Sequence, residues 1–247
     1  MKRILFIIIL TLFWGIPGTG IFASDNKEPG ISKHVATTPV HRMNENWWQN
    51  RYEQKVNEAK TKEIDILLLG DSITHGWDNH KELLKKFFGE KVLNFGMSGD
   101  RTEHTLWILD QGNLDALKPK MIMLMIGTNN IGHHSSTPEM TVDGITEIIK
   151  RLQKKFPDSP VLLLAVFPRD AKPDGVKRNQ VLEINKNLPP LADGKKVEFL
   201  DLQEKFLDPN GEISPEIMRD FLHPTKKGYE IWGTEITPFI KKWVYPE

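Results

Sequence analysis

The sequence predicts an α/β fold, a three-layer α/β/α sandwich around a five-stranded parallel sheet. Five short apolar runs, of the kind that is buried in parallel sheets, recur along the chain, and stretches with helical spacing separate them. Strands that alternate with helices are joined by right-handed crossovers, which place helices on both faces of the sheet. With 247 residues, of which 39% are hydrophobic, the chain can bury one core, so we expect one folded domain.

The predicted strands are apolar runs that are too short to be buried helices. In chain order they are Ile64–Leu69, Lys91–Phe95, Met121–Ile126, Val161–Val166 and Val197–Leu200.

A first helix is predicted from about Asn44, because apolar and charged residues alternate there with helical spacing. Its apolar members are Trp47, Trp48, Tyr52, Val56 and Ala59. We expect this helix to pack on the edge of the sheet. Its adjacent tryptophans either join the core, which is the favoured reading, or form a platform for a sugar near the site.

The later helices are predicted from the same spacing. Ile145, Ile148, Ile149 and Leu152 follow the i, i+3, i+4, i+7 pattern of one apolar face. A less regular pattern begins at Val181 and should end before Pro189, because proline disrupts a helix interior. The charged stretch Lys81–Lys91 is expected to be a solvated helix face, and a last helix is expected from about Thr225 to Lys242.

Residues 1–23 resemble an export signal, since Lys2 and Arg3 precede the apolar stretch Ile4–Trp14 and small residues follow it. The alternative is a membrane anchor, but a span needs about 20 apolar residues. We therefore expect a secreted or periplasmic protein with no stable membrane span once the signal is removed. Residues 24–43 contain proline, glycine, serine and threonine and are expected to be a flexible linker, with the folded domain at 44–247.

Composition excludes several classes of function. Lys and Arg number 33, as do Asp and Glu, so no net positive charge indicates a nucleic-acid partner. The absence of cysteine excludes disulfides, a thiol nucleophile and a Cys-ligated zinc site. No cofactor or metal is expected, because the adjacent His133 and His134 lack an accompanying carboxylate cluster.

The first predicted strand ends in Gly70-Asp71-Ser72, which places a serine hydroxyl where ligands bind in open α/β sheets. The N–H groups of the segment that follows can stabilise an anion. Serine is a weak nucleophile that needs an imidazole to take its proton and a carboxylate to orient that imidazole. His223 and Asp220 supply both, with Nε2 of His223 expected to face Ser72 and Nδ1–H to face Asp220. Without the other motifs, the stretch from Asp220 to Pro224 would indicate the start of the terminal helix, with His223 at the surface, rather than a catalytic pair.

Four ordered blocks of sequence resemble the GDSL, or SGNH, hydrolase family. They are Gly70-Asp71-Ser72, Asn94-Phe95-Gly96-Met97-Ser98-Gly99-Asp100, Ile126-Gly127-Thr128-Asn129-Asn130 and Asp220-Phe221-Leu222-His223-Pro224. Ile73 stands where leucine is common in the family. Within the family the sequence is most similar to the catalytic subunits of brain platelet-activating-factor acetylhydrolase. This resemblance implies a flavodoxin-like SGNH hydrolase fold.

The resemblance also implies roles for individual residues. Ser72, His223 and Asp220 would form a catalytic triad, and the oxyanion would be bound by the backbone N–H groups of Ser72 and Gly99 and the amide of Asn129. The family's narrow acyl pocket would be bordered by the side chains of Ile73, Thr128 and Leu222. Asp100-Arg101 and His104, at and just after the end of the second block, either face the pocket or have helix-start and surface roles.

The resemblance implies an exported serine esterase that removes small acyl groups, above all acetyl, from a small-molecule or carbohydrate ester. A phospholipid acetylhydrolase or lipase is an alternative with the same chemistry. A non-catalytic carbohydrate-binding module is a third reading, although every catalytic position is filled. Fold alone does not separate these readings, and the sequence leaves the oligomeric state open.

Overall fold

A computed structural model describes residues 33–133 and 136–246. The predicted export signal at 1–23 and the first part of the predicted linker lie outside these residues. None of the helices within the described ranges is both long and apolar enough to span a bilayer.

All strand pairs of the central sheet are parallel, and the strand order is β2-β1-β3-β4-β5. The strands are β1 Ile66–Gly70, β2 Val92–Gly96, β3 Met121–Met125, β4 Val161–Leu164 and β5 Val197–Leu200. Each lies within or next to a predicted apolar run, so the predicted five-stranded parallel sheet is confirmed. This order is the flavodoxin-like one, in which β2 is added on one side of β1 and the later strands on the other side. The change of side creates a ligand crevice at the carboxyl ends of β1 and β3.

Two hydrophobic cores cover the two faces of the sheet, because successive strand side chains point to opposite sides. Leu67 and Leu69 belong to the core under one set of helices, and Ile66 and Leu68 belong to the other. The first set comprises α1 Asn46–Thr61, α4 Thr102–Asp110, α6 Pro138–Lys155 and α7 Val176–Lys186. The second comprises α3 Lys81–Phe88 and α8 Lys226–Trp243.

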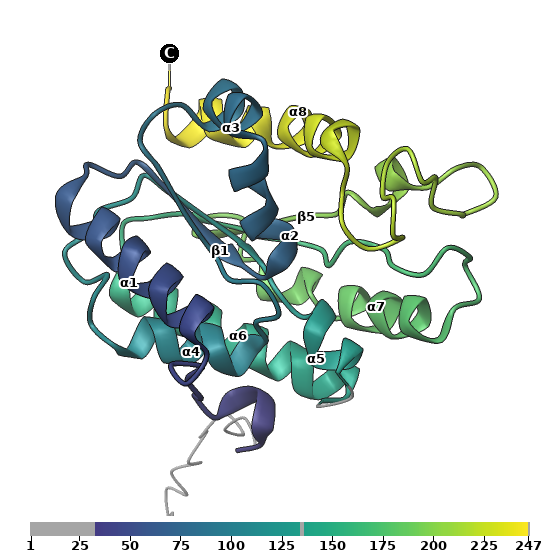
Figure 1. Cartoon of the computed structure of the whole chain (residues 1–247), viewed down its shortest axis with the longest axis horizontal. Helices are drawn as coiled ribbons and strands as arrows, with labels where there is room; N and C mark the ends of the chain where they lie inside the picture. The colour runs from purple at the N-terminus through teal and green to yellow at the C-terminus, as the bar shows by residue number, and fades with distance from the viewer. Residues whose placement is uncertain (1–32, 134–135, 247) are drawn as a thin grey trace, which may run out of the picture. The chain divides into compact units, whose positions relative to one another are not determined.

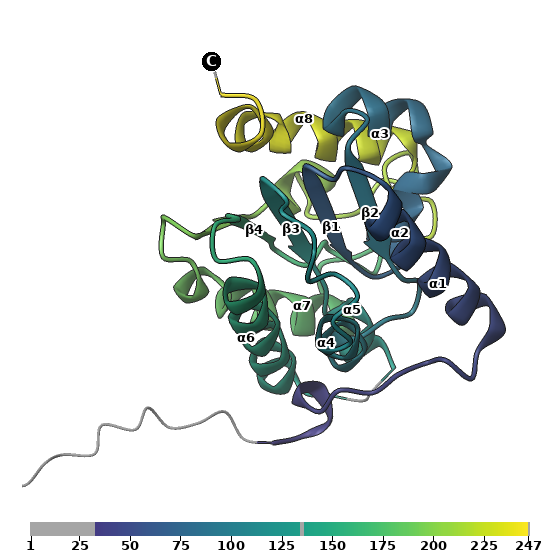
Figure 2. The same ribbon diagram turned by 90° about the vertical axis from the view of Figure 1, so that its left-hand side faces the viewer.

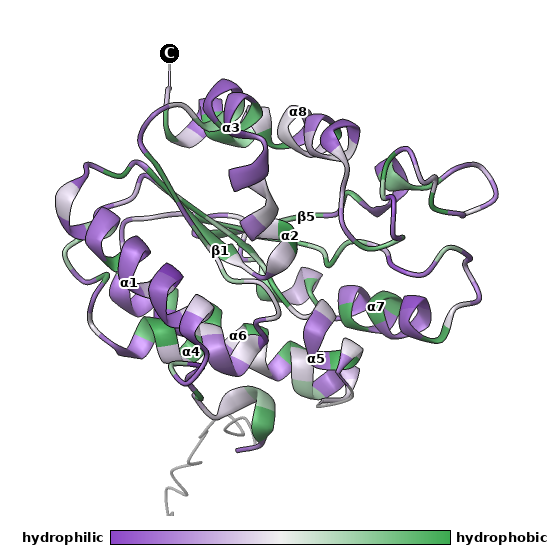
Figure 3. Ribbon diagram, in the orientation of Figure 1, coloured by the Kyte–Doolittle hydropathy of each residue, from purple (hydrophilic) through white to green (hydrophobic). Residues whose placement is uncertain are grey.

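The layers are visible directly in the ribbon. Figures 1 and 2 show α3 and α8 on one side of the sheet and α1, α4, α6 and α7 on the other. Figure 3 shows the strands as the most hydrophobic part of the chain, as expected for a sheet covered on both faces. The predicted three-layer sandwich is therefore confirmed.

Helix α1 packs against the edge strand β2, as predicted. Trp48 is fully buried and stacks on Tyr52 with ring centroids 5.3 Å apart, so it joins the core. Trp47 remains 43% exposed. Only one of the two tryptophans therefore has the role that the sequence favoured.

Part of the predicted flexible linker is packed on the folded domain, because a 3₁₀ helix within residues 33–43 contacts α4 and α6. The short 3₁₀ helix Val35–Thr37 buries Ala36, whose carbonyl accepts a hydrogen bond from Thr102 Oγ1 at 2.9 Å. The N–H of Val40 donates to the Glu103 carbonyl at 3.1 Å. The prolines and threonines that suggested a linker reveal nothing of these partners, which come from distant helices.

Candidate active site

The carboxyl ends of β1, β2 and β3 lie level with one another, since Gly70 pairs with both Gly96 and Met125. Ser72 follows the first of these strands, Gly99 the second and Asn129 the third. The register of the sheet therefore brings the three predicted residues to one edge, at the crevice beside β1.

Ser72, His223 and Asp220 form a continuous hydrogen-bonded chain. Ser72 Oγ lies 2.9 Å from His223 Nε2, and His223 Nδ1 lies 2.7 Å from Asp220 Oδ2. These are the ring nitrogens that the sequence analysis assigned to each contact. The His223 and Asp220 side chains are 43% and 55% exposed, so the group lies at an open surface.

A tight turn holds Asp220 and His223 together. Phe221 has a φ of 59°, a left-handed conformation that is uncommon for an aromatic residue and costs conformational energy. This turn lets Asp220 Oδ1 accept hydrogen bonds from the N–H groups of Leu222 at 3.2 Å and His223 at 2.8 Å. Burial raises the pKa of Asp220, but the hydrogen bonds from the His223 ring and backbone outweigh it, and the net pKa lies below the usual value.

Asp71 supports the segment that carries Ser72. It caps helix α2 (Ser72–His75) by accepting a hydrogen bond from the N–H of Ile73 at 2.9 Å. Its carboxyl is almost fully buried, and burial raises its pKa to about 6. Tyr229 of α8 donates from its hydroxyl to the Ile73 carbonyl at 2.7 Å, which ties α2 to the terminal helix.

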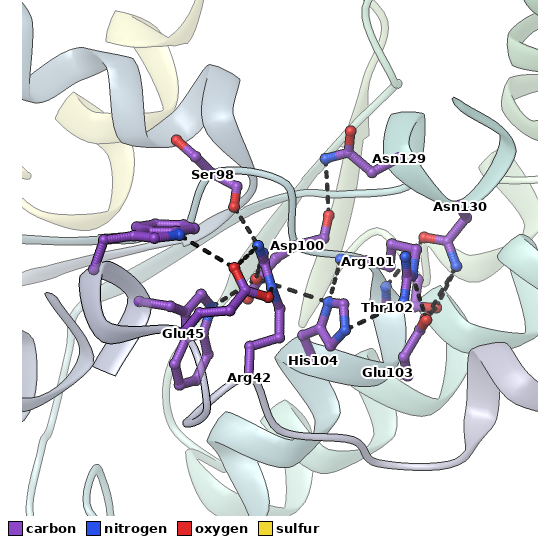
Figure 4. A network of polar contacts seen from close by, with 12 residues as sticks. Arg42, Glu45, Ser98, Asp100, Arg101, Thr102, Glu103, His104, Asn129 and Asn130 are labelled. Atoms are coloured by element: carbon purple, nitrogen blue, oxygen red, sulfur yellow. Dashed lines mark hydrogen bonds and ion pairs between the residues drawn. The ribbon is translucent and has the colours of Figure 1, made fainter. Parts of the chain in front are cut away.

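The loop after β2 places Gly99 beside Asn129. Gly99 has a φ of 76°, which favours glycine, and a Cβ there would lie 3.2 Å from Nη1 of Arg42. Asn129, in α5 (Thr128–Gly132), donates from its amide nitrogen to the carbonyl of Asp100 at 3.0 Å. Figure 4 shows the Asn129 amide directed toward this loop. The positive φ and the neighbouring Arg42 guanidinium together explain why glycine stands at position 99.

A cavity of about 300 Å³ adjoins Ser72. Its surface is polar and apolar in about equal parts, and its lining consists of Ser72, His75, Gly76, Asn79, His80, Ser98, His223, Pro224 and Tyr229. His75 Nδ1 lies 2.8 Å from Ser98 Oγ, and burial, together with the nearby Arg51 charge, lowers the pKa of His75 to about 4. His75 is therefore neutral at neutral pH. No pattern in the sequence indicates this pair, although each residue lies in or beside a family block.

None of the three predicted acyl-pocket residues lines this cavity. Ile73 is 1% exposed and belongs to the core under α3 and α8. Thr128 is also 1% exposed, and Arg169 Nη1 donates to its hydroxyl at 3.0 Å and to its carbonyl at 2.8 Å. The side chains of both residues therefore face the interior, although their backbones adjoin the site. Leu222 is partly buried against the same core as Ile73.

Asp100 and His104 are buried, which excludes a surface role for them, whereas the helix-start role is supported because the N–H of Arg101, the N-cap of α4, donates to His104 Nδ1 at 3.0 Å. Burial raises the pKa of Asp100 to about 7 and lowers the pKa of His104 to about 3, the latter with the help of the Arg101 and Arg42 charges. Both residues lie in the polar network of Figure 4, together with Arg42 and Asn129.

Metal ligation finds no support in residues 33–133 and 136–246, where no group of three His, Cys, Asp or Glu side chains could hold an ion. His134 lies outside the described residues. The arrangement of Ser72, His223 and Asp220 has the geometry in which an imidazole can accept a serine proton while a carboxylate fixes its tautomer.

Comparisons with known proteins agree with this chemistry. The model of the GDSL-like Lipase/Acylhydrolase family matches residues 68–231. Platelet-activating factor acetylhydrolase IB subunit alpha2 of Rattus norvegicus is 35% identical over 187 residues, which cover 74% of this chain and 78% of the relative. The alpha1 subunit of Homo sapiens is 33% identical over 198 residues, covering 78% of this chain and 82% of the relative.

Solved structures share the fold. A GDSL-like lipase from Bacteroides thetaiotaomicron superposes with a TM-score of 0.65 at 21% identity, covering 77% of this chain and 97% of that chain. A carbohydrate acetylesterase from Sinorhizobium meliloti superposes with a TM-score of 0.57 at 19% identity, covering 73% and 99%.

Proposed function

This chain belongs to the GDSL-like lipase/acylhydrolase family and is an esterase-type hydrolase, and from that premise we propose an exported acetylesterase that uses Ser72, His223 and Asp220. The observation that supports it most is the chain of contacts from Ser72 Oγ to His223 Nε2 at 2.9 Å and from His223 Nδ1 to Asp220 Oδ2 at 2.7 Å. A non-catalytic binding module has no need of this chain of contacts.

In the proposed reaction, His223 Nε2 takes the proton of Ser72 Oγ as the oxygen attacks the ester carbonyl. The negative charge that develops on the carbonyl oxygen is stabilised by N–H donors of Ser72, Gly99 and Asn129. The imidazolium of His223, paired with ionised Asp220, then protonates the departing alcohol. Water repeats the sequence on the acyl-enzyme and releases the acid.

Acetyl is the proposed acyl group. Relatives at 33–35% identity are named acetylhydrolases, and the chain covers more than two thirds of their length. Leu222 adjoins His223 and is the predicted acyl-pocket residue that remains a candidate, since it is not fully buried.

Acetylated carbohydrate is the proposed substrate class. The cavity beside Ser72 offers hydrogen-bonding groups from His75, Asn79 and Ser98, which suit the hydroxyl groups of a sugar. The exposure of His223 and Asp220 leaves the site open to a bulky or polymeric ester. Export, proposed from the sequence of residues 1–23, would bring the enzyme to such substrates.

A phospholipid acetylhydrolase is the second candidate, and the names of the relatives favour it. The two candidates differ in the alcohol that leaves. In one case it is a choline phospholipid, and in the other it is a sugar with several hydroxyl groups. The hydrogen-bonding side chains of His75, Asn79 and Ser98 beside the nucleophile favour the sugar.

The test is hydrolysis by the purified mature protein of acetylated xylo-oligosaccharides, a platelet-activating-factor-type phospholipid and 4-nitrophenyl acetate, each with Ser72→Ala beside the wild type. We expect turnover of the sugar esters and of the nitrophenyl ester, and loss of nearly all of it in the variant. Turnover of the phospholipid with none of the sugar esters would select the second candidate. Full activity in Ser72→Ala would disprove the proposed site.

A further inference from the structure

Arg42, which precedes α1, lies against the loop that contains Gly99. Its Nη1 donates to the Ser98 carbonyl at 2.8 Å and to Asp100 Oδ1 at 2.8 Å, so one nitrogen holds the residues on both sides of Gly99. Figure 4 shows this guanidinium against the loop. Composition alone predicts a flexible linker at this position and gives no sign of the contact.

The guanidinium is itself held rigidly. Its Nε and Nη2 each donate to a different carboxylate oxygen of Glu45 at 2.8 Å, the bidentate geometry that fixes an arginine most firmly. The Arg42 guanidinium carbon lies 5.1 Å from the ring centroid of Trp47, and the Arg42 side chain is only 17% exposed. This contact gives the exposed Trp47 a role at the surface.

The segment that carries Arg42 is anchored to the rest of the domain. Val40 donates to the Glu103 carbonyl, Thr102 donates to the Ala36 carbonyl, and His34 Nε2 lies 3.1 Å from Asp143 Oδ2. Arg42 is thus presented to the Gly99 loop from a fixed position.

Asp100 connects this contact to the Asn129 amide, another of the proposed oxyanion donors. Its carboxylate oxygen Oδ1 accepts from Arg42 and from Trp48 Nε1, the latter at 2.7 Å, while its backbone carbonyl accepts from the Asn129 amide at 3.0 Å. Its other carboxylate oxygen is buried and has no hydrogen-bond partner in the described part of the chain. Arg42 therefore supplies one of the two hydrogen bonds on this buried carboxyl, and its removal would leave Trp48 Nε1 as the other donor.

We propose that Arg42 is a positioning residue for the oxyanion hole, which it supports through the Ser98–Gly99–Asp100 loop and through the Asn129 amide that this loop orients. The inference rests on the proposed function, since it assigns the Gly99 N–H and the Asn129 amide to the oxyanion. Donors of this kind act mainly in the transition state, so their misplacement lowers kcat more than it raises KM.

The test compares Arg42→Ala and Arg42→Lys with Arg151→Ala, a control that removes an arginine of α6 whose two carboxylate partners are Asp110 of α4 and Glu147 of α6. On 4-nitrophenyl acetate we expect kcat to fall roughly 10- to 100-fold in both Arg42 variants with KM within about threefold, because a small displacement of a catalytic group can cost that much. Arg151→Ala should keep the wild-type kcat. Millimolar methylguanidinium should restore part of the kcat of Arg42→Ala.

A double-mutant cycle with Asn129→Ala separates positioning from stability. If Arg42 acts through the donors, the combined loss of kcat is smaller than the product of the two single losses. Arg42→Lys, which keeps the charge, covers the case in which Arg42→Ala fails to fold. Wild-type kcat in a folded Arg42→Lys, or a combined loss equal to the product, would overturn the inference. Ser72→Ala tests the proposed function separately, so an inactive Ser72→Ala beside a fully active Arg42→Lys would refute the positioning role alone.

Discussion

Ser72 Oγ lies 2.9 Å from His223 Nε2, although 151 positions separate the two residues in the chain. The contact joins the end of β1 to the loop that precedes α8, and the Tyr229 hydroxyl makes a second link between the same regions by donating to the Ile73 carbonyl at 2.7 Å. The alignment of nucleophile and imidazole therefore depends on how α8 packs on the sheet.

Asp220→Asn should lower kcat on the order of 10⁴-fold, because an amide cannot fix the tautomer of His223 that accepts the serine proton. The matched control is Asp208→Asn, since Asp208 Oδ1 also accepts hydrogen bonds from two backbone N–H groups, at 2.8 and 2.9 Å. Steady-state kinetics on 4-nitrophenyl acetate would measure both. Near-normal turnover by Asp220→Asn would remove Asp220 from the mechanism.

Acetyl esters should be hydrolysed at least about 10-fold more efficiently than butyryl esters of the same alcohol, because each added methylene in a fitted pocket costs about 1–3 kcal/mol. Leu222→Ala should narrow this ratio, whereas Leu182→Ala, at a position 47% exposed on α7, should leave it unchanged. The measurement is kcat/KM on 4-nitrophenyl acetate and butyrate. A wild-type preference for octanoyl over acetyl would instead favour a lipase.

Ser98→Ala should weaken recognition of the alcohol. The variant removes the hydroxyl that lies 2.8 Å from His75 Nδ1 and leaves intact the Ser98 carbonyl that Arg42 binds. We expect KM for acetylated xylo-oligosaccharides to rise roughly 3- to 10-fold, in line with the loss of one hydrogen bond of about 1 kcal/mol. The kcat and KM for 4-nitrophenyl acetate, which has no sugar hydroxyls, serve as the internal control and should not change. Equal effects on both substrates would argue against a sugar-binding role.

Asp71→Asn should change how stability depends on pH. Folding raises the pKa of Asp71 from an ordinary 3.8 to about 6, so the folded state binds the proton more tightly than the unfolded state. The stability that this proton contributes is complete below about pH 4 and is lost as the pH rises through about 6. Relative to Asp71→Asn, the wild type should therefore lose up to about 3 kcal/mol of unfolding free energy between pH 4 and pH 7.

Urea unfolding of both proteins at several pH values would measure this difference. The asparagine of the variant can still cap α2 through its side-chain oxygen, so the comparison isolates the proton. Asp201→Asn is the control, because exposed Asp201 makes the same hydrogen bond to the N–H two residues on, at 2.9 Å. Parallel curves for wild type and Asp71→Asn would contradict the prediction.

The fold could be predicted from the periodicity of apolar residues and from the order of the segments, because both can be recognised in short stretches of the sequence. The strand from Met121 and the helix around Ile145 to Leu152 were found from their apolar spacing, and parallel strands that alternate with helices have few alternative arrangements. The family blocks indicated the residues at the strand ends, and the structure brings Ser72, His223 and Asp220 within hydrogen-bond distance.

The failures have a common cause in tertiary packing. Residues 33–43 have the composition of a linker, yet Ala36 is buried and Val40 is hydrogen-bonded, because the groups they contact belong to helices far away in sequence. Ile73 adjoins Ser72 in the chain, but successive residues of a helix point in different directions, and this side chain enters the core.

The layered α/β architecture, the family and the identity of the residues at the strand ends could all be read from the chain alone, because spacing and motif order are properties of the sequence. Three features arise only in the folded protein. Arg42 contacts the loop that contains Gly99, Asp100 is buried, and the hydrogen-bonded His75 and Ser98 line the cavity beside Ser72. They depend on burial and on distances between remote segments. Both are set only when the helices pack on the sheet, and no local pattern encodes them.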